Sequence, residues 1–497
     1  MKSLHPLLLF TFLLLAACAG NDPAADVSEE INAIENGLLL PIAVKGDSTQ
    51  GMNIEERMAF HRVPGISIAV VEDGAVKWAK AYGIANTDTG QPVDVQTLFQ
   101  AGSISKPVAA LAALKLAEEG KVDLDEDVNT YLKGWQIPDS KFTAEEKVTL
   151  RRLLTHNAGM TVHGFPGYTQ QDVFPSIISV LNGEGNTPAI FVDTLPGSIW
   201  RYSGGGYTVM EKVVEDVSGQ PLEVYLAENI LPQFGMTHST YEQPLPEGRH
   251  GEASAAYDNQ GELIDGLWHN YPEQAAAGLW TTPTDLANYI ITVQEILAGK
   301  KEGALRKETL KAMLTKHKND WGLGPSLMWD GDSLLFRHGG KNAGFTNEMI
   351  GTAYQGKGMI VMTNADNGGR LMGEIIRGIS SYYDWGISQP REVELVSLSE
   401  EELASFAGRY KLNFQVAGIG DYWVDVNVKD GQLEVDDPNN GEINYLSPLE
   451  AMKFIDLTVG DEVLFSQSAN QDTLGMLWNG RFQFYKVDET TAASTDE

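Results

Sequence analysis

The sequence predicts an α+β domain over residues 31–390, followed by a small all-β barrel over residues 400–488. Two apolar hairpin patterns, at 65–83 and 347–366, enclose segments with helical periodicity. Strands from both ends of a domain around a helical insert are typical of an antiparallel sheet in an α+β fold. Beyond Trp385 the apolar residues alternate with polar ones in short runs, which indicates a barrel or a sandwich.

Residues 1–17 have the pattern of a secretory signal peptide, because a basic residue precedes an apolar run too short to span a bilayer well. The run ends on Leu15-Ala16-Ala17-Cys18, which resembles a bacterial lipobox. Cys18 is the only cysteine, so it forms no internal disulfide. The resemblance implies a lipoprotein of the bacterial cell envelope, on the periplasmic side of the outer membrane. We expect the lipid on Cys18 to hold the protein at the membrane and residues 18–30 to form a tether between the lipid and the folded body. A signal peptide that ends on its sole cysteine by chance is the alternative.

The overall charge argues against one class of partner. The 497 residues include 68 Asp and Glu against 36 Lys and Arg, a formal net charge of −32 at pH 7. A surface of this sign repels phosphate backbones, so we expect no nucleic-acid partner. We interpret the acidity as a contribution to solubility.

The elements of the first domain are predicted from their turns and ends. The first hairpin turns at Asp73-Gly74 and the second around 356–358. Helices are predicted over Val108–Glu119, Thr208–Val217 and Leu371–Tyr383. The first two are each followed by a glycine, the residue type that favours a left-handed C-cap.

A short helix is predicted between the two domains. Ser399 and Glu402 have the spacing of a capping box, for a helix that ends at Gly408. Valines then alternate with polar residues over 424–428, and later apolar runs are separated by turn residues. This β-domain is either a lid over a substrate-binding cleft or a solvated appendage. Residues 489–497 are expected to form a disordered tail.

Ser103 and Lys106 lie three residues apart, a spacing that places two side chains on one helix face with Cβ atoms about 5–6 Å apart. Pro107 favours a helix start here, because the first turn leaves its N–H groups unpaired anyway. A buried lysine at a helix N-terminus has a lowered pKa, since desolvation and the helix dipole both favour the neutral amine. A neutral amine can accept the serine's proton and make it a nucleophile. The alternative is a solvated lysine at a helix start.

Two further stretches contain side chains suited to the same chemistry. WRYSGGGYTVMEKVVEDVSG places Tyr202 in a glycine-rich turn before an amphipathic helix. FRHGGKNAGF places His338, Gly339 and Gly340 just before the second hairpin, where small residues let a substrate lie along a strand whose N–H groups can complete an oxyanion hole. Taken singly, Tyr202 fits a core aromatic, His338 a buried hydrogen-bonded imidazole and the glycines a turn.

Ser-x-x-Lys, Tyr-Ser-x and His-x-Gly, in this order, resemble the serine β-lactamase and penicillin-binding protein superfamily. The chain is most similar to class C β-lactamases and their esterase and D-aminopeptidase relatives, the peptidase S12-like branch. The resemblance spans roughly residues 30–385 and includes LRRLLTHNAGM, LPQFGMTHST, AAAGLWTTPTDLANYI and WGLGPSL. It implies the β-lactamase/transpeptidase-like form of the α+β fold. The C-terminal segment resembles the lipocalin-like β-domains of some relatives.

The resemblance implies an acyl-enzyme mechanism without a metal or an organic cofactor. Ser103 is then the acylated nucleophile and Lys106 its activating neighbour. Tyr202 matches the tyrosine that shares proton transfer with the lysine in both half-reactions. Acylation of the serine and hydrolysis of the acyl-enzyme agree with the chemistry argued from the residues alone.

Substrate-binding positions follow from the same resemblance. His338 and Gly340 match the third motif on an edge strand, and the backbone N–H groups of Ser103 and Lys341 form the oxyanion hole. Gly204 stands where β-lactamases have the asparagine of Tyr-x-Asn. His338 replaces the lysine of Lys-Thr-Gly and is charged only partly near neutral pH. Both changes favour an ester or a small peptide substrate over an antibiotic.

We therefore predict a lipid-anchored serine hydrolase that acts on an ester or a small peptide or amide. A β-lactamase, or a D-Ala-directed carboxypeptidase or aminopeptidase, is an alternative within the same fold. A non-catalytic penicillin-recognition protein that binds cell-wall peptides is a second alternative, because Gly204 shows that one motif residue is lost. No Gly-x-Ser-x-Gly motif occurs, which excludes an α/β-hydrolase.

Overall fold

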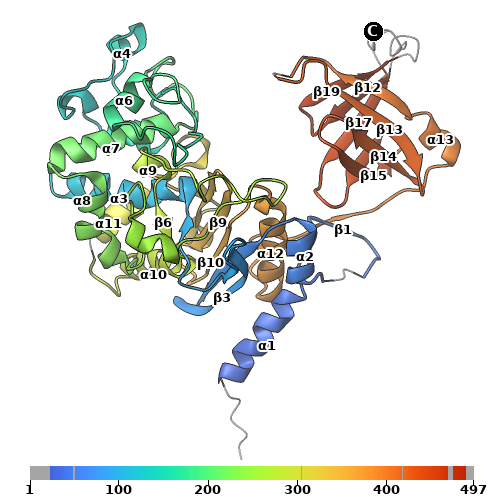
Figure 1. Cartoon of the computed structure of the whole chain (residues 1–497), viewed down its shortest axis with the longest axis horizontal. Helices are drawn as coiled ribbons and strands as arrows, with labels where there is room; N and C mark the ends of the chain where they lie inside the picture. The colour runs from blue at the N-terminus through green and yellow to red at the C-terminus, as the bar shows by residue number, and fades with distance from the viewer. Residues whose placement is uncertain (1–22, 49–50, 304, 417, 468–473, 488–497) are drawn as a thin grey trace, which may run out of the picture.

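The computed structural model has two bodies, a larger one built on a seven-stranded sheet and a smaller closed barrel (Figure 1). It describes residues 23–48, 51–303, 305–416, 418–467 and 474–487. Cys18 and the predicted signal peptide lie outside the described residues, as does the predicted tail over 489–497. Within the described ranges, none of the helices combines the length and the apolar character that a bilayer crossing requires. The predicted α+β fold with a C-terminal barrel is confirmed.

The large sheet is antiparallel and has the strand order β4-β3-β2-β10-β9-β8-β7. Both predicted hairpins are confirmed, as β2–β3 and β9–β10, and they meet where β10 pairs with β2. The strands of this sheet are β2 Gly65–Glu72, β3 Ala75–Asn86, β4 Gln91–Pro92, β7 Ser326–Met328, β8 Leu335–Asn342, β9 Phe345–Thr352 and β10 Gly358–Thr363. Two small pairs accompany it, β1 Ile42–Val44 with β11 Arg391–Val393, and β5 Phe99–Gln100 with β6 Trp280–Thr281.

The central strands are buried on both faces of the sheet. In β2, Ile66, Ile68 and Val70 face one apolar core, whereas Ala69 and Val71 face the other. Successive side chains of a strand point to opposite faces, so a strand between two helical layers needs apolar residues at every position. This explains the uninterrupted apolar run that the sequence shows there.

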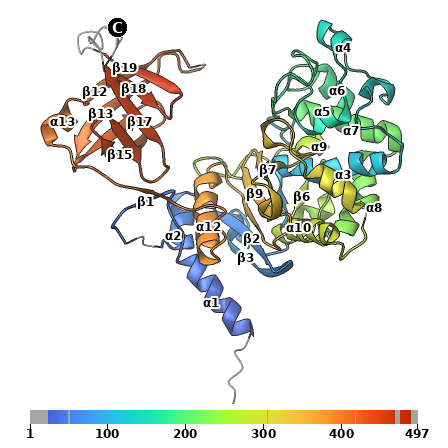
Figure 2. The ribbon, with the colours of Figure 1, turned by 180° about the vertical axis from the view of Figure 1, so that it is seen from behind.

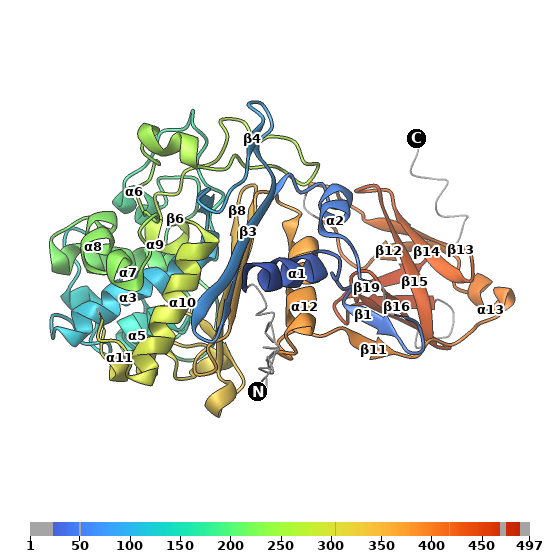
Figure 3. The ribbon, with the colours of Figure 1, turned by 90° about the horizontal axis from the view of Figure 1, so that it is seen from below.

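Three helices cover the first face of the sheet, α1 Pro23–Glu35, α2 Ile54–Phe60 and α12 Gly368–Tyr382 (Figure 3). In α12, Leu371, Ile375 and Ile379 are spaced by four residues and are fully buried, as expected for the apolar stripe of an amphipathic helix. The helix predicted over Leu371–Tyr383 is therefore confirmed, with a start three residues earlier.

Helix α1 differs from the tether predicted over residues 18–30, and that prediction is wrong from residue 23 onward. Val27, Ile31 and Ile34, spaced four and three residues apart, lie on one side of α1 and pack against the core of the first face. The small polar residues between them suggested a linker, but their apolar spacing is that of a helix.

The second face carries the helical layer, in which α3, α7 and α9 pack together and α10 lies on the sheet. Its helices are α3 Ser105–Glu118, α4 Lys141–Glu145, α5 Leu150–Leu154, α6 Ile177–Asn182, α7 Gly204–Ser218, α8 Leu222–Asn229, α9 Gln274–Ala277, α10 Pro283–Ala298 and α11 Lys307–Met313. Short 3-10 turns lie between the elements of the larger domain: η1 Gly102–Ile104, η2 Val128–Thr130, η3 Leu231–Phe234, η4 Glu247–Glu252, η5 Lys318–Asp320 and η6 Gly331–Ser333.

Helix α7 begins four residues before its predicted start. Ser203 caps it by accepting the Gly206 N–H, and the three glycines that follow Ser203 form its first turn. A Cβ built on Gly205 would lie 2.7 Å from the Thr161 carbonyl oxygen, so glycine is needed for this close approach. The sequence pattern did not predict this turn, because glycine has a low helix propensity. The helix ends as predicted at Gly219, which is left-handed with φ 74°.

The barrel closes because β12 pairs with both β13 and β19. Its strands are β12 Gly408–Leu412, β13 Trp423–Lys429, β14 Gln432–Asp437, β15 Glu442–Glu450, β16 Lys453–Asp456, β17 Glu462–Gln467, β18 Leu474–Trp478 and β19 Phe482–Lys486. The predicted capping box at Ser399 is present and begins α13 Glu400–Ala404. This helix ends at Ala404 and not at Gly408, which has φ 142° and opens β12.

The barrel lies on the side of the sheet that α12 and α1 cover, away from the helical layer (Figures 2 and 3). It contacts the β1–β11 pair, where the Arg391 guanidinium forms an ion pair with Glu462 at 2.7 Å. The order of layers, from the helical layer through the sheet and α12 to the barrel, favours an appendage over a lid.

Candidate active site

Ser103 lies in the 3-10 turn η1, which leads directly into α3. The Ser105 hydroxyl fixes this turn, because it donates to the Gly102 carbonyl at 2.5 Å and accepts from the Leu279 N–H at 3.0 Å. Ser103 itself is half-buried. The predicted helix start near Ser103 therefore holds, with the serine just before the first α-helical turn.

Lys106 points its amine at the Ser103 hydroxyl. Its Nζ lies 3.0 Å from Ser103 Oγ and 2.8 Å from the Ala276 carbonyl oxygen, and the side chain is buried. Burial lowers the pKa of Lys106 to about 7, so about half of the amines are neutral at pH 7. The alternative of a solvated lysine is excluded.

Tyr202 comes from the turn before α7 and reaches the same place. The Lys106 Nζ lies 5.0 Å from the centre of the Tyr202 ring. Among the described residues the buried phenol oxygen has no hydrogen bond of good geometry, although Ser103 is close enough to favour its ionisation slightly. Burial is the larger effect and raises the pKa of Tyr202, which keeps the phenol protonated. The structure thus brings Ser103, Lys106 and Tyr202 together.

Strand β8 lies against the turn that contains Ser103. A Cβ built on Gly340 would be 1.9 Å from the Ala101 carbonyl oxygen, and one on Gly102, which has φ 54°, would be 2.5 Å from the Lys341 nitrogen. Both positions therefore need glycine. This approach places the Lys341 main chain beside the Ser103 turn, on the segments from which the sequence predicts the two oxyanion-hole amides.

Lys341 contributes its main chain and not its charge. Its side chain forms an ion pair with Asp366 at 2.7 Å and donates to Thr346 Oγ1 at 3.1 Å. Arg337, on the same strand, pairs with Glu348 at 2.9 Å. Both cations of β8 are therefore already neutralised by carboxylates.

His338 is neutral, which corrects the expectation of a partly charged imidazole. Burial, followed by the positive charge of Lys106, lowers the pKa of His338 to about 3. Its Nδ1 lies 2.6 Å from the Gly339 carbonyl oxygen, and because a carbonyl only accepts, Nδ1 carries the proton. Nε2 is then an acceptor, without a partner among the described residues.

Gly204 offers a substrate neither a side chain nor a free N–H. Its N–H donates to the His163 carbonyl at 3.1 Å, and a Cβ built on it would lie 2.8 Å from the Phe165 ring. The substrate-binding role that the resemblance implies for Gly204 stays a prediction, which its engaged N–H does not favour. An asparagine side chain would have to displace Phe165 to fit there.

Aromatic side chains around Tyr202 form a cluster for which the sequence assigned no role. His156 lies 4.2 Å from the Tyr202 ring, and Trp200 and Trp321 lie 5.4 Å apart, measured between ring centres. Trp321 also contacts His338 at 5.5 Å. His156 and Trp321 belong to segments that supported the family resemblance, LRRLLTHNAGM and WGLGPSL, but neither segment indicated that its ring would meet Tyr202.

Glu273 is a second feature that the sequence did not indicate. Its carboxyl group is fully buried just before α9, the helix whose Ala276 carbonyl binds Lys106, and neither oxygen has a partner among the described residues. Burial raises the pKa of Glu273 to about 8, which keeps it protonated at pH 7. Glu273 therefore places no negative charge behind the site.

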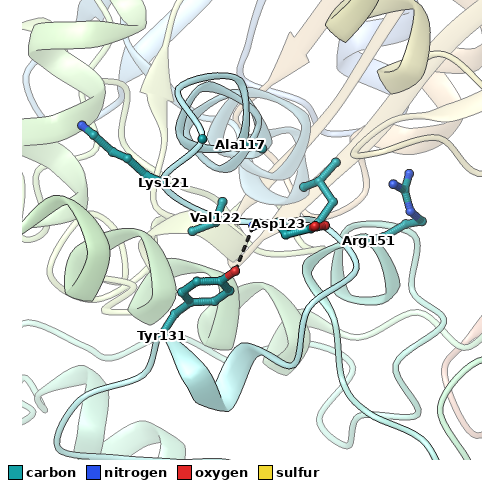
Figure 4. Close-up of a pocket in the computed structure, with 8 residues that line it drawn as sticks. Ala117, Lys121, Val122, Asp123, Tyr131 and Arg151 are labelled. Atoms are coloured by element: carbon teal, nitrogen blue, oxygen red, sulfur yellow. Dashed lines mark hydrogen bonds between the residues drawn. The ribbon is translucent and has the colours of Figure 1, made fainter.

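A cavity of about 550 Å³ lies at the other end of α3, lined by residues that include Lys121, Tyr131 and Arg151 (Figure 4). Helix α3 has 14 residues and is therefore about 20 Å long, which separates this cavity from Ser103. Arg151 forms an ion pair with Asp125 at 2.6 Å. The cavity does not belong to the site around Ser103. Within the described part of the chain, no group of three or more His, Cys, Asp or Glu side chains is arranged to hold a metal ion.

Comparison with known proteins gives a family match. A model of the family described as Beta-lactamase matches residues 52–381. An Escherichia coli (strain K12) protein named "Putative D-alanyl-D-alanine carboxypeptidase" is 28% identical over an alignment of 323 residues, and the match covers 56% of this chain and 72% of the relative. "Protein flp" of Staphylococcus aureus (strain N315) is 27% identical over an alignment of 251 residues, and the match covers 49% of this chain and 48% of the relative.

Solved structures share the fold. The octameric penicillin-binding protein homologue from Pyrococcus abyssi superimposes with a TM-score of 0.60 at 23% identity, covering 87% of this chain and 98% of the other. A class C β-lactamase gives a TM-score of 0.53 at 20% identity, covering 72% of this chain and 97% of the other. At these identities the likeness extends to the fold alone.

Proposed function

Because the chain belongs to the Beta-lactamase family, we propose that it is a serine hydrolase that forms an acyl-enzyme on Ser103. The contact of 3.0 Å between the Lys106 amine and the Ser103 hydroxyl carries this proposal, together with the lysine pKa of about 7. A buried amine that is half neutral at pH 7 is matched to the task of a general base.

The proposed reaction has two half-reactions. Lys106 accepts the proton of Ser103 as Oγ bonds to the substrate carbonyl carbon, and the N–H groups of Ser103 and Lys341 stabilise the oxyanion. The bond to the leaving alcohol or amine breaks as that group takes a proton from the Lys106 ammonium, with the Tyr202 phenol between donor and acceptor. Water then adds to the acyl carbon, and the carboxylic acid leaves as Oγ regains its proton.

Three features support an ester or a small uncharged peptide as the substrate. The neutral His338 provides no cation, and the cations of β8, Arg337 and Lys341, are paired with carboxylates. Gly204 provides no amide side chain. A substrate carboxylate, such as that of a β-lactam or of a C-terminal D-Ala, would find no free positive charge along this strand.

A D-Ala-directed peptidase is the second candidate within the fold. The name of the E. coli relative favours it, and its match covers 72% of that protein. The same geometry of Ser103 and Lys106 serves both substrate classes. The non-catalytic alternative is less well supported, because a recognition protein has no use for a buried lysine with a lowered pKa.

Replacement of the nucleophile tests the proposal. We expect Ser103→Ala to abolish hydrolysis of a p-nitrophenyl butyrate ester and labelling by a fluorophosphonate, because the variant lacks the hydroxyl that forms the acyl-enzyme. Intact-mass spectrometry of the wild type should show one added acyl group, and a proteolytic digest should place it on the peptide that contains Ser103. Ser326→Ala, a change of a half-buried serine on β7, is the matched control and should keep both activities. Full turnover by the Ser103 variant would refute the mechanism, and faster hydrolysis of nitrocefin than of esters would move the assignment to β-lactamase.

We also propose that the chain is anchored to the bacterial envelope by a lipid on Cys18, which the lipobox-like sequence supports. Cys18→Ser should move the protein from the detergent phase to the aqueous phase of a Triton X-114 partition, because the acyl chains would be lost. An unchanged partition would contradict the anchor without affecting the proposed hydrolase.

A further inference from the structure

The phenol of Tyr202 is buried, and within the described ranges only the weak interaction with Ser103 acts on its hydroxyl. Among the described residues the Tyr202 oxygen has no partner of good geometry, and the nearby Lys106 amine is engaged by Ser103 and Ala276. A side chain that transfers protons must nevertheless be held in one orientation. The orientation of the phenol must therefore be set by the groups that contact the main chain and the ring of Tyr202.

Two histidines bind the main chain on either side of Tyr202. The backbone carbonyl of His156 accepts a hydrogen bond from the Arg201 N–H at 2.9 Å. The imidazole Nδ1 of His156 accepts one from the Ser203 N–H at 3.1 Å. From the opposite side, His163 Nδ1 donates to the Tyr202 carbonyl at 2.5 Å. Both amides that flank Tyr202 are thus bound by one residue, and its carbonyl is bound by another.

The ring of His156 also packs on the phenol. The two ring centres are 4.2 Å apart and the planes are inclined by 36°. Trp321 and Tyr207 fix the imidazole in turn, at 5.0 and 5.3 Å. His156 is 2% exposed and has φ 56°, a left-handed conformation that is uncommon outside glycine but that asparagine, aspartate and histidine adopt more often than other residues.

The acceptor on His156 persists over the working range of pH. A backbone N–H only donates, so the Nδ1 that it binds carries no proton. Burial, followed by the positive charge of Lys106, keeps the pKa of His156 well below its usual value. The hydrogen bond from the Ser203 N–H is therefore present whether Lys106 is charged or neutral.

We propose that His156 and His163 are positioning residues that hold Tyr202 in the orientation needed for proton transfer. The inference rests on the proposed function, because Tyr202 has a partner in catalysis only if Ser103 is acylated. Loss of the His156 acceptor frees the 201–203 segment and lets the phenol turn away from Lys106. Substrate binding is unaffected, so the loss appears in kcat and not in KM.

A matched pair of variants separates the acceptor from the volume of His156. His156→Asn keeps an acceptor, because Oδ1 is as many bonds from Cα as Nδ1, and asparagine tolerates a positive φ. His156→Leu has the same branching without an acceptor. We expect the Asn variant to keep kcat within about threefold, and the Leu variant to lose about tenfold to a hundredfold at unchanged KM. Equal losses in the two variants would overturn the role of the acceptor.

A double-mutant cycle with Tyr202→Phe distinguishes positioning from general destabilisation. If His156 acts through the phenol, His156→Leu should cost less than about twofold in the Tyr202→Phe background. A purely structural role predicts the same factor in both backgrounds, and that result would overturn the proposal.

His163→Ala serves if His156→Leu does not fold, because His163 is exposed and outside the core. We expect a loss of about threefold to tenfold in kcat that also disappears in the Tyr202→Phe background. An unchanged kcat in His163→Ala would remove His163 from the proposal. Fluorophosphonate labelling of Ser103 separates the two levels of failure: an additive cycle in a protein that still labels refutes only the positioning role, whereas a wild type that does not label refutes the proposed function.

Discussion

The candidate active site and the barrel interior are both buried, but they are built in opposite ways. At the site, four buried polar atoms without a partner among the described residues lie in one aromatic cluster, on His156, Trp200, Tyr202 and His338. The described part of the barrel contains no such atom. Its interior is filled by apolar side chains, among them Tyr410, Leu433, Val435, Leu446, Phe454, Val463, Phe465 and Met476.

The difference is that the larger domain, unlike the barrel, accommodates buried polar atoms without partners. Such atoms are costly, and among the described residues they occur both in the aromatic cluster and elsewhere in this domain, for example on Tyr289 and Trp385. The charges of the barrel instead form pairs at its surface, such as Arg409 with Asp425 at 2.8 Å and Lys429 with Glu434 at 2.6 Å. Exposed pairs of this kind contribute little to stability or to reactivity.

Among the changes that test this comparison, replacement of Lys106 should have the largest effect on activity. Lys106→Met removes the general base at nearly constant volume, and we expect kcat/KM for an ester to fall by about a thousandfold. Lys115→Met is the matched control, since Lys115 lies on the same helix and pairs with Glu119 at 3.4 Å. Steady-state kinetics of both variants check the result. A Lys106 variant with more than a tenth of the wild-type activity would exclude this lysine as the base.

The same Lys106→Met variant should be more stable than the wild type. The amine has its ordinary pKa of 10.5 in the unfolded chain and a pKa of about 7 in the folded chain. Between these pH values the unfolded chain holds a proton that the folded chain has lost, so the buried lysine destabilises the fold fully below pH 7 and progressively less up to about pH 10. The gain in melting temperature should therefore be greatest below pH 7, and a gain that rises with pH would contradict the assigned pKa.

The next largest effect should be the fall of kcat/KM on the acid side of the pH profile. Protonation of Lys106 removes the base, so kcat/KM should fall tenfold for each pH unit below about 7. His338, with a pKa of about 3, should add no second step above pH 4. Tyr202→Phe should lower the activity without moving the midpoint, because the phenol stays protonated in this range. A midpoint near pH 5 would exclude Lys106 as the titrating group.

The outcome for individual residues shows which parts of the site the sequence could predict. Ser103 and Lys106 are close in sequence and share a helix start, so helix geometry alone places them together. The environment of His338 could not be predicted, because its burial depends on Trp321 and on the Tyr202 turn, which are distant in sequence. The motif indicated a partly charged imidazole, and only tertiary packing makes it neutral.

The fold shows the same division. The hairpins of the sheet and the barrel strands are predicted from alternation and turn residues, which are local signals. Helix α1 was missed because its apolar residues are few, and they bury only against α12 and the sheet. The first turn of α7 was missed because glycines have poor helix propensity, which the packing of Gly205 on the Thr161 carbonyl overrides.

The smallest effect on activity should come from a large change in the barrel. Phe465 is fully buried and contacts Phe406 and Phe454, with ring centres 4.6 and 5.5 Å away. Phe465→Ala should lower the free energy of unfolding of the barrel by about 3–5 kcal/mol, through lost apolar contacts and a cavity. Because the sheet and α12 separate the barrel from the helical layer, kcat/KM for a small ester should stay within about twofold well below the melting temperature.

Phe336→Ala is the matched change in the catalytic domain, since Phe336 is equally buried but lies in β8, two residues before His338. A similar loss of stability should here come with a loss of activity of about tenfold, because β8 lies against the Ser103 turn and a cavity beneath it lets the strand shift. Thermal unfolding and ester kinetics, measured on both variants at one temperature, give the comparison. A Phe465 variant with an altered KM would mean that the barrel reaches the substrate after all, and the lid hypothesis would then be preferred over the appendage.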